Sequence, residues 1–192
     1  MIGTGGPAAP GSEAAGGGDA GVPVFLGLGA NLGDPLAQLA RAVRALTVRF
    51  GDLRTSGVYR SRPEDGSRQP DYLNAAVRLT TLEPPDDVLA FGARLEDEAG
   101  RVRARVHGAR PLDVDLLFYG DLVCATPRLT LPHPRWARRP FVVLPLVDLD
   151  PLWVDPSSGR SVASVAVERG WTDGSLTRVL PPGRLGAQDG DS

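Results

Sequence analysis

Two aspartates within an apolar run are the first side chains of this sequence that could do chemistry. Asp113 and Asp115 lie two residues apart in the stretch RPLDVDLLFY. Alternate side chains of a strand share one face, so both carboxylates would point away from the apolar residues between and around them, about 7 Å apart. Such a pair could hold one or two Mg²⁺ ions together with phosphate oxygens. The alternative is a pair of surface aspartates on an exposed sheet face.

The arginines that precede this pair favour phosphate chemistry. Metal ions neutralise part of the charge of a phosphate chain and guanidinium groups bind the rest, as phosphoryl transfer requires. The chain has no lysine, so a phosphate loop of the Gly-Lys-Ser/Thr type is excluded. The alternative is a solvated basic loop. The four arginines are Arg101, Arg103, Arg105 and Arg110.

Two further motifs have residue types that occur in nucleotide-binding sites. The stretch LPHPRWARRPF presents His133 between two prolines, beside Trp136 and several arginines, and could contact a nucleotide. A lone histidine is more often structural. The stretch GLGANLGD has the spacing G-x-G-x-x-x-G, which misses the dinucleotide-binding fingerprint. It is interpreted as a tight turn from a strand into a helix.

The elements that would position these residues follow from periodicity. Apolar alternation predicts strands over 22–29, 53–61, 72–82 and 112–118, and the last of these would place Leu112, Val114, Leu116 and Phe118 on one face. Helical spacing and capping residues predict helices over 35–50 and 84–99. The order βαββαβ predicts a ferredoxin-like α+β sandwich with helices on one sheet face and the site on the other. The stretch FVVLPLVDL is ambiguous between a strand and a short helix.

Composition limits the number of domains, the compartment and the partners that the chain can be expected to have. With 192 residues, a net charge of −2 and one cysteine, the chain suits a single domain in a reducing compartment, and a cytoplasmic monomer is expected. No nucleic-acid or membrane partner is expected, because there is no basic field, no spanning segment and no signal sequence. Residues 1–21 and 174–192 are rich in small and polar residues and are predicted to be flexible tails around a domain at 22–173.

Taken in order, these motifs resemble one family, the 6-hydroxymethyl-7,8-dihydropterin pyrophosphokinases of folate biosynthesis. The resemblance covers residues 23–165 and implies transfer of a pyrophosphoryl group from ATP to the hydroxymethyl group of the pterin, with AMP as the other product. The stretches QPDYLNA and RPLDVDLL are the most specific. The full set is GLGANLGD, YRSRP, QPDYLNAAV, GRVR, RPLDVDLL, LTLPHPR, RRPFVVLPL and DP.

The resemblance also implies a role for each matching residue. Asp113 and Asp115 would bind two Mg²⁺ ions that bridge the phosphates of ATP, and would help the pterin hydroxyl lose its proton. Asn74 would hydrogen-bond the pterin edge, with Tyr72 and Phe141 beside the ring. The residues expected to meet ATP are Arg101, Arg103 and Arg110 from a closing loop, together with Glu96, Arg128, Thr130, His133 and Arg139.

Four positions depart from the family pattern and put loop closure, not the chemistry, in question: Arg62, Glu64, His107 and Ala109. One rival reading is a ferredoxin-like binding module that has lost catalysis, which predicts a damaged metal pair or a missing asparagine. Asp113, Asp115, Asn74 and His133 are all present, so the enzyme is favoured. A second rival, an RNA-binding sheet, predicts exposed aromatic residues on a basic face, whereas carboxylates are expected here.

Overall fold

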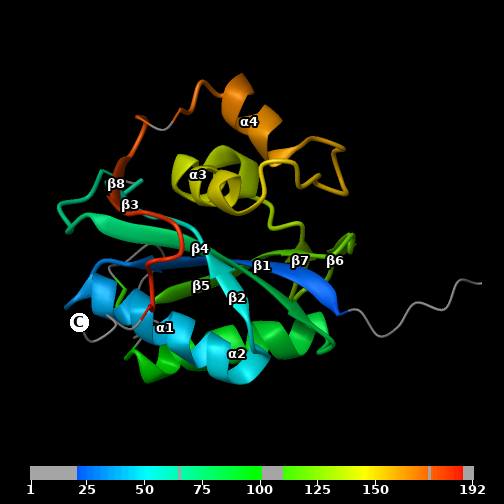
Figure 1. Ribbon diagram of the computed structural model, residues 1–192, viewed down its shortest axis with the longest axis horizontal. Helices are drawn as coiled ribbons and strands as arrows, with labels where there is room; N and C mark the ends of the chain where they lie inside the picture. The colour runs from blue at the N-terminus through cyan, green and yellow to red at the C-terminus, as the bar shows by residue number, and fades with distance from the viewer. Residues whose placement is uncertain (1–20, 65, 101–109, 173, 188–192) are drawn as a thin grey trace, which may run out of the picture.

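The computed structural model describes residues 21–187 apart from 65, 101–109 and 173. Its centre is an antiparallel six-stranded sheet in the order β5-β1-β4-β3-β8, with β2 also paired to β4 (Figure 1). A hairpin of two short strands, β6 (Cys124–Ala125) and β7 (Thr130–Leu131), stands apart. The strands of the sheet are β1 (Val22–Ala30), β2 (Leu53–Thr55), β3 (Val58–Ser61), β4 (Tyr72–Thr81), β5 (Asp113–Tyr119) and β8 (Thr177–Leu180).

Helices lie on both faces of this sheet. The predicted helices, α1 (Pro35–Phe50) and α2 (Pro85–Glu98), cover one face, which confirms the βαββαβ sandwich (Figure 1). On the opposite face lie α3 (Pro140–Leu149), preceded by the short 3-10 helix η1 (Trp136–Arg138), and α4 (Val162–Glu168). Among the described residues no helix is both long and apolar enough to cross a membrane.

The ends of α1 follow from its sequence. The side chain of Asp34 accepts a hydrogen bond from the backbone N–H of Ala37 at 3.1 Å, and Pro35 occupies the first helical position. Gly51 ends the helix with φ 79°, a conformation that glycine adopts without strain. Leu39 and Leu46 are fully buried against the sheet. The predicted helix is therefore confirmed in both extent and orientation.

The stretch 53–61 forms two strands rather than the single one predicted. Ser56 and Gly57 separate β2 from β3, and the hydroxyl of Ser56 accepts a hydrogen bond from Ala76 of β4 at 2.8 Å. A Cβ at Gly57 would lie 2.8 Å from the carbonyl oxygen of Leu180, so no larger residue fits without a shift. This break lets β8 approach the outer side of β3.

Strand β5 changes face after Leu116. Its register with β1 shifts between Phe25 and Leu26, so one extra residue of β5 is accommodated and the alternation reverses. Leu112, Val114 and Leu116 face α1 and α2 as predicted, but Phe118 packs in the cluster under α3 and α4. The prediction for Phe118 is wrong because a β-bulge cannot be seen from alternation alone.

The ambiguous stretch FVVLPLVDL is the helix α3. Pro140 opens it, and Pro145 lies inside it, flanked by buried Val142, Val143 and Leu146. The helix is apolar over most of its surface because it lies between the sheet and α4. The exception is Asp148, which accepts hydrogen bonds from Tyr59 and Arg178. It forms the centre of a second hydrophobic cluster, separate from the one between the sheet and the pair α1 and α2.

The prediction of a flexible tail from residue 174 is wrong for residues 174–187. Thr177–Leu180 pairs with β3 as β8, and Leu185 is buried against the first cluster. Arg178 binds the hydroxyl of Tyr59 at 2.7 Å and the carboxylate of Asp148 at 3.2 Å. These long-range contacts hold the segment with β8 and Leu185 against the rest of the domain. Most of the N-terminal stretch 1–21 and all of 188–192 lie outside the described residues.

Candidate active site

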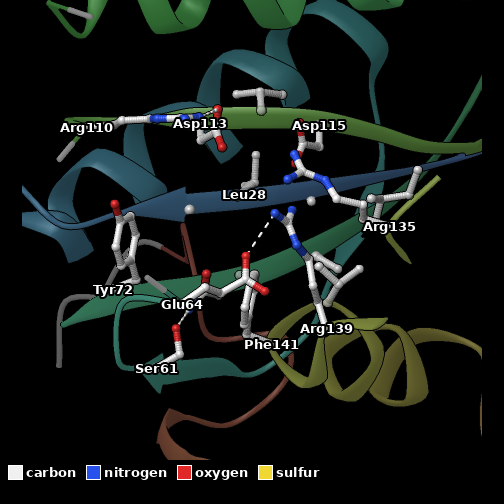
Figure 2. A pocket seen from close by; sticks show the side chains of 18 of the residues that line it. Leu28, Ser61, Glu64, Tyr72, Arg110, Asp113, Asp115, Arg135, Arg139 and Phe141 are labelled. Carbon is white, nitrogen blue, oxygen red and sulfur yellow. Dashed lines mark hydrogen bonds and ion pairs between the residues drawn. The ribbon is translucent and has the colours of Figure 1, made fainter. Parts of the chain in front are cut away.

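A cavity of about 660 Å³ opens over the middle of the sheet. Strands β1, β4 and β5 line it, together with α2, the segment that follows β3, and the start of α3 (Figure 2). Of the residues expected to bind substrates, it is lined by Tyr72, Asn74, Glu96, Arg110, Asp113, Asp115, Arg139 and Phe141. Residues separated widely in sequence are thus brought to one site.

The two aspartates lie on the same side of β5, as alternation predicts. Between them Val114 is buried on the opposite face, and both carboxylates line the cavity (Figure 2). Arg110 donates a hydrogen bond from Nη1 to Oδ1 of Asp113 at 2.8 Å. His133 lies beside Asp115, with 4.0 Å between Nε2 and Oδ2. Arg110 therefore holds Asp113 by a hydrogen bond, whereas His133 is a neighbour of Asp115 beyond hydrogen-bond distance.

The electrostatics of this pair fit a divalent cation. Burial raises the pKa of Asp115, and the negative charge of Asp113 raises it further, against the opposite effect of His133 and the arginines Arg139 and Arg135. Burial lowers the pKa of His133, although Asp115 acts against that shift. A cation between the carboxylates would relieve their repulsion. Within the described chain no group of three or more His, Cys, Asp or Glu is arranged to hold a metal, so phosphate and water would complete the shell of Mg²⁺.

Residues that pair with one another across β4, β1 and β5 form the floor of the cavity. In the sheet Gly29 pairs with Asn74 on one side and with Asp113 on the other, and Gly27 pairs with Asp115. A Cβ at Gly29 would lie 3.5 Å from Oδ1 of Asn74 and 3.9 Å from Cβ of Asp113. The glycines therefore belong to β1 and leave space above it. Both glycines lie in the predicted strand 22–29, and the turn from strand to helix follows them.

Asn74 and two aromatic residues form the part of the cavity farther from Asp115. Asn74 is buried and donates from Nδ2 to Oγ of Ser61 at 2.9 Å, which fixes its amide plane. Tyr72 and Phe141, both half-buried, line the cavity from β4 and from the start of α3. A fixed amide near two rings suits a flat heterocycle with hydrogen-bonding edges.

Four arginines line the cavity: Arg62, Arg110, Arg135 and Arg139. Arg139 is buried, its guanidinium lies 5.5 Å from the centre of the Phe141 ring, and its Nη2 is 2.9 Å from Oε2 of Glu64 (Figure 2). Arg135 is one of the arginines of LPHPRWARRPF that could contact a nucleotide. Arg101, Arg103, His107 and Ala109 lie outside the described residues, so their predicted roles stay predictions.

Three other residues expected to meet ATP lie at or beyond the margin. Arg128 and Thr130 are exposed on the hairpin β6–β7 and do not line the cavity. Glu96 lines it but is buried, and its Oε1 accepts a hydrogen bond from the backbone N–H of Val114 at 2.9 Å. Glu96 therefore ties α2 to the strand that carries the aspartates.

Asn31 is a site residue that the sequence reading missed. It is 2% exposed, and its Oδ1 accepts from the backbone N–H of Arg110 at 2.8 Å. Its Nδ2 donates to the carbonyl oxygen of Pro70 at 3.2 Å and to Oε1 of Gln69 at 3.3 Å. One amide thus joins β1 to the segments that precede Asp113 and Tyr72. The only signal for this role was its place in the motif GLGANLGD.

The comparisons with known proteins agree with this geometry. A family model described as 7,8-dihydro-6-hydroxymethylpterin-pyrophosphokinase (HPPK) matches residues 25–151. The chain belongs to the HPPK family. It is 42% identical over 139 residues to the 2-amino-4-hydroxy-6-hydroxymethyldihydropteridine pyrophosphokinase of Synechocystis, covering 71% of each chain. The enzyme of the same name from Haemophilus influenzae is 37% identical, with 71% of this chain and 87% of that one covered.

Solved structures share the HPPK fold. HPPK-DHPS of Plasmodium falciparum, solved with pteroate, matches 77% of this chain with a TM-score of 0.63 at 14% identity. The same protein solved with pterin and p-hydroxybenzoate gives a TM-score of 0.64 at 13% identity. The chain spans 42–43% of those longer chains, so the likeness concerns the fold alone. Strand β8 lies beyond the residues that the HPPK family model matches.

Proposed function

We propose that this chain transfers the pyrophosphoryl group of ATP to the hydroxymethyl group of 6-hydroxymethyl-7,8-dihydropterin, giving AMP and the pterin diphosphate in folate biosynthesis. The observation that carries the proposal is the row Asn74, Gly29 and Asp113 across β4, β1 and β5. It places a fixed amide and a carboxylate pair in one cavity, inside the region that the family model matches.

In this proposal the pterin lies at the Asn74 end of the cavity. The amide of Asn74 binds the polar edge of the ring, and Tyr72 and Phe141 contact its faces. Its hydroxymethyl group then points along the row toward Asp113 and Asp115. Their carboxylates accept the hydroxyl proton as the oxygen bonds to the β-phosphorus and the bond to the leaving AMP oxygen breaks.

The phosphates of ATP lie at the other end, among the carboxylates and arginines. Asp113 and Asp115 hold Mg²⁺, and we infer two ions, because two carboxylates and a chain of three phosphates offer oxygens for both. Bound Mg²⁺ would neutralise phosphate charge during transfer. Arg110, Arg135 and Arg139 contact the remaining phosphate oxygens, and Arg101 and Arg103 would add to them. We propose that the enzyme acts as a monomer, since the described part of this chain brings residues for both the pterin and the phosphates to one cavity.

The test is incubation with ATP, Mg²⁺ and 6-hydroxymethyl-7,8-dihydropterin, followed by chromatography of the nucleotides. AMP is expected, and ADP as the product would contradict the proposal. Asp113→Asn and Asp115→Asn each remove a charge without changing size and should lower kcat at least about a hundredfold. The control is Asp121→Asn, because Asp121 is exposed just beyond β5 and does not line the cavity.

A further inference from the structure

The carboxylate of a residue in the segment after β3 forms an ion pair with one of the arginines that line the cavity. Oε2 of Glu64 lies 2.9 Å from Nη2 of Arg139, which precedes α3 (Figure 2). The side chain of Arg139 is 10% exposed and that of Glu64 is 51% exposed. The arginine is thus a fixed part of the wall, whereas the glutamate reaches it from the solvent side.

The same guanidinium is one of the groups that we assign to the phosphates of ATP. An arginine always carries its charge and binds carboxylate and phosphate oxygens through the same planar set of N–H groups. One face of the Arg139 guanidinium is covered, because it lies over the ring of Phe141. A phosphate that approaches Arg139 therefore meets the carboxylate of Glu64, and two anions at one guanidinium repel each other.

We propose that Glu64 is an internal competitor for the phosphate site, which leaves Arg139 when ATP binds. This inference rests on the proposed function, since it takes Arg139 to be a phosphate ligand. Two consequences follow. Glu64 weakens the binding of ATP, and the arrival of ATP releases the segment around Glu64 from α3. That segment joins Ser61 and Tyr72, which both line the pterin end of the cavity, so nucleotide binding would alter the wall that the pterin meets.

The expected size of the effect is modest. Ion pairs with one half-exposed partner contribute little in water, so removing the carboxylate charge should tighten ATP binding about two- to fivefold. Salt screens an exposed pair, so the gain should shrink as ionic strength rises to about 0.5 M. A purely structural role for Glu64 would produce neither the tighter binding nor its loss in salt.

The test is calorimetric titration of the full chain with ATP and Mg²⁺ in the absence of pterin, at low and high salt. Glu64→Gln should bind ATP more tightly than the wild type at low salt. The matched control is Glu83→Gln, because Glu83 pairs with Arg49 at the same 2.9 Å but lies away from the cavity. Its affinity for ATP should equal that of the wild type.

A double-mutant cycle locates the effect. In an Arg139→Gln background, Glu64→Gln should change ATP affinity by less than about 1.5-fold, because the competition has been removed. Equal or weaker binding of ATP by Glu64→Gln alone would overturn the inference. Failure of the proposed function would look different: the wild type itself would not bind ATP with Mg²⁺ and would form no AMP.

Discussion

Replacing Asn31 by alanine should reveal how much of the site depends on one buried amide. The substitution removes three hydrogen bonds, one from the backbone N–H of Arg110 and two to the segment at Gln69 and Pro70. Typical hydrogen bonds contribute about 0.5–1.5 kcal/mol each, and the N–H of Arg110 would lose a partner. We therefore expect Asn31→Ala to lower the free energy of unfolding by about 2–4 kcal/mol.

The effect on activity should exceed the effect on affinity. Without the amide, the backbone at Arg110 keeps only the hydrogen bond that its carbonyl oxygen accepts from the backbone N–H of Asn31 at 3.1 Å. A displacement of about 1 Å at a reacting group can cost about a hundredfold in rate. We expect kcat to fall about ten- to a hundredfold, with a smaller change in the KM for ATP. Urea unfolding measures the first effect, and steady-state kinetics at a temperature where the variant is folded measures the second.

Gln69→Ala is the comparison for this experiment. It removes one of the three hydrogen bonds of Asn31 and leaves the bond to Arg110, but it also removes the bonds of Gln69 with Ser67 and with the hydroxyl of Tyr72. Its cost should be about 1–2 kcal/mol, with a smaller loss of kcat than in Asn31→Ala. A folded Asn31→Ala enzyme with the turnover of the wild type would refute the assignment of Asn31 as the residue that positions Arg110. If Asn31→Ala and Gln69→Ala lowered the free energy of unfolding equally, the estimate based on the three hydrogen bonds of Asn31 would be wrong.

Three further perturbations have defined outcomes. Gly29→Ala places a methyl group between Asn74 and Asp113, in ordinary contact with both, so the melting temperature should hold while the KM for the pterin rises about tenfold. Arg178→Ala removes the donor to Tyr59 and should lower the free energy of unfolding in urea by about 1–3 kcal/mol, with Arg169→Ala as the exposed control. Burial raises the pKa of Asp155, but hydrogen bonds from neighbouring serines outweigh it, and its pKa lies below the usual 3.8. Its stabilising effect is therefore present above that pH and lost as pH falls through the lowered pKa. Asp155→Asn should be less stable than the wild type at pH 7, and the difference in unfolding free energy should narrow as the pH falls below about 4.

The carboxylate pair could be predicted because strand alternation is a local rule. Asp113 and Asp115 sit two residues apart in a strand whose other side chains are apolar, so their shared face follows without knowledge of the neighbours. The same rule applies to Asn74, which alternates in β4 with the apolar residues Leu73 and Ala75. Glycine at 27 and 29 could not be assigned to the floor, because that role depends on the strands that flank β1.

Features set by distant contacts escaped prediction. The change of face at Phe118 depends on the register between β5 and β1, which alternation within β5 does not contain. Strand β8 is four residues long, and its anchor is the contact of Arg178 with Tyr59, 119 positions away. The amide of Asn31 joins segments 38–79 positions away. In each case a pairing partner, not a local pattern, determines the structure.

The second hydrophobic cluster also determines what an optical experiment on this protein would see. All three tryptophans of the chain belong to it: Trp136 is buried within it, and Trp153 and Trp171 pack against it. Intrinsic tryptophan emission therefore reports on the layer of α3 and α4, while the core between the sheet and the first two helices is silent. Far-ultraviolet circular dichroism registers both layers, so coincident transitions by the two signals would indicate one cooperative unit.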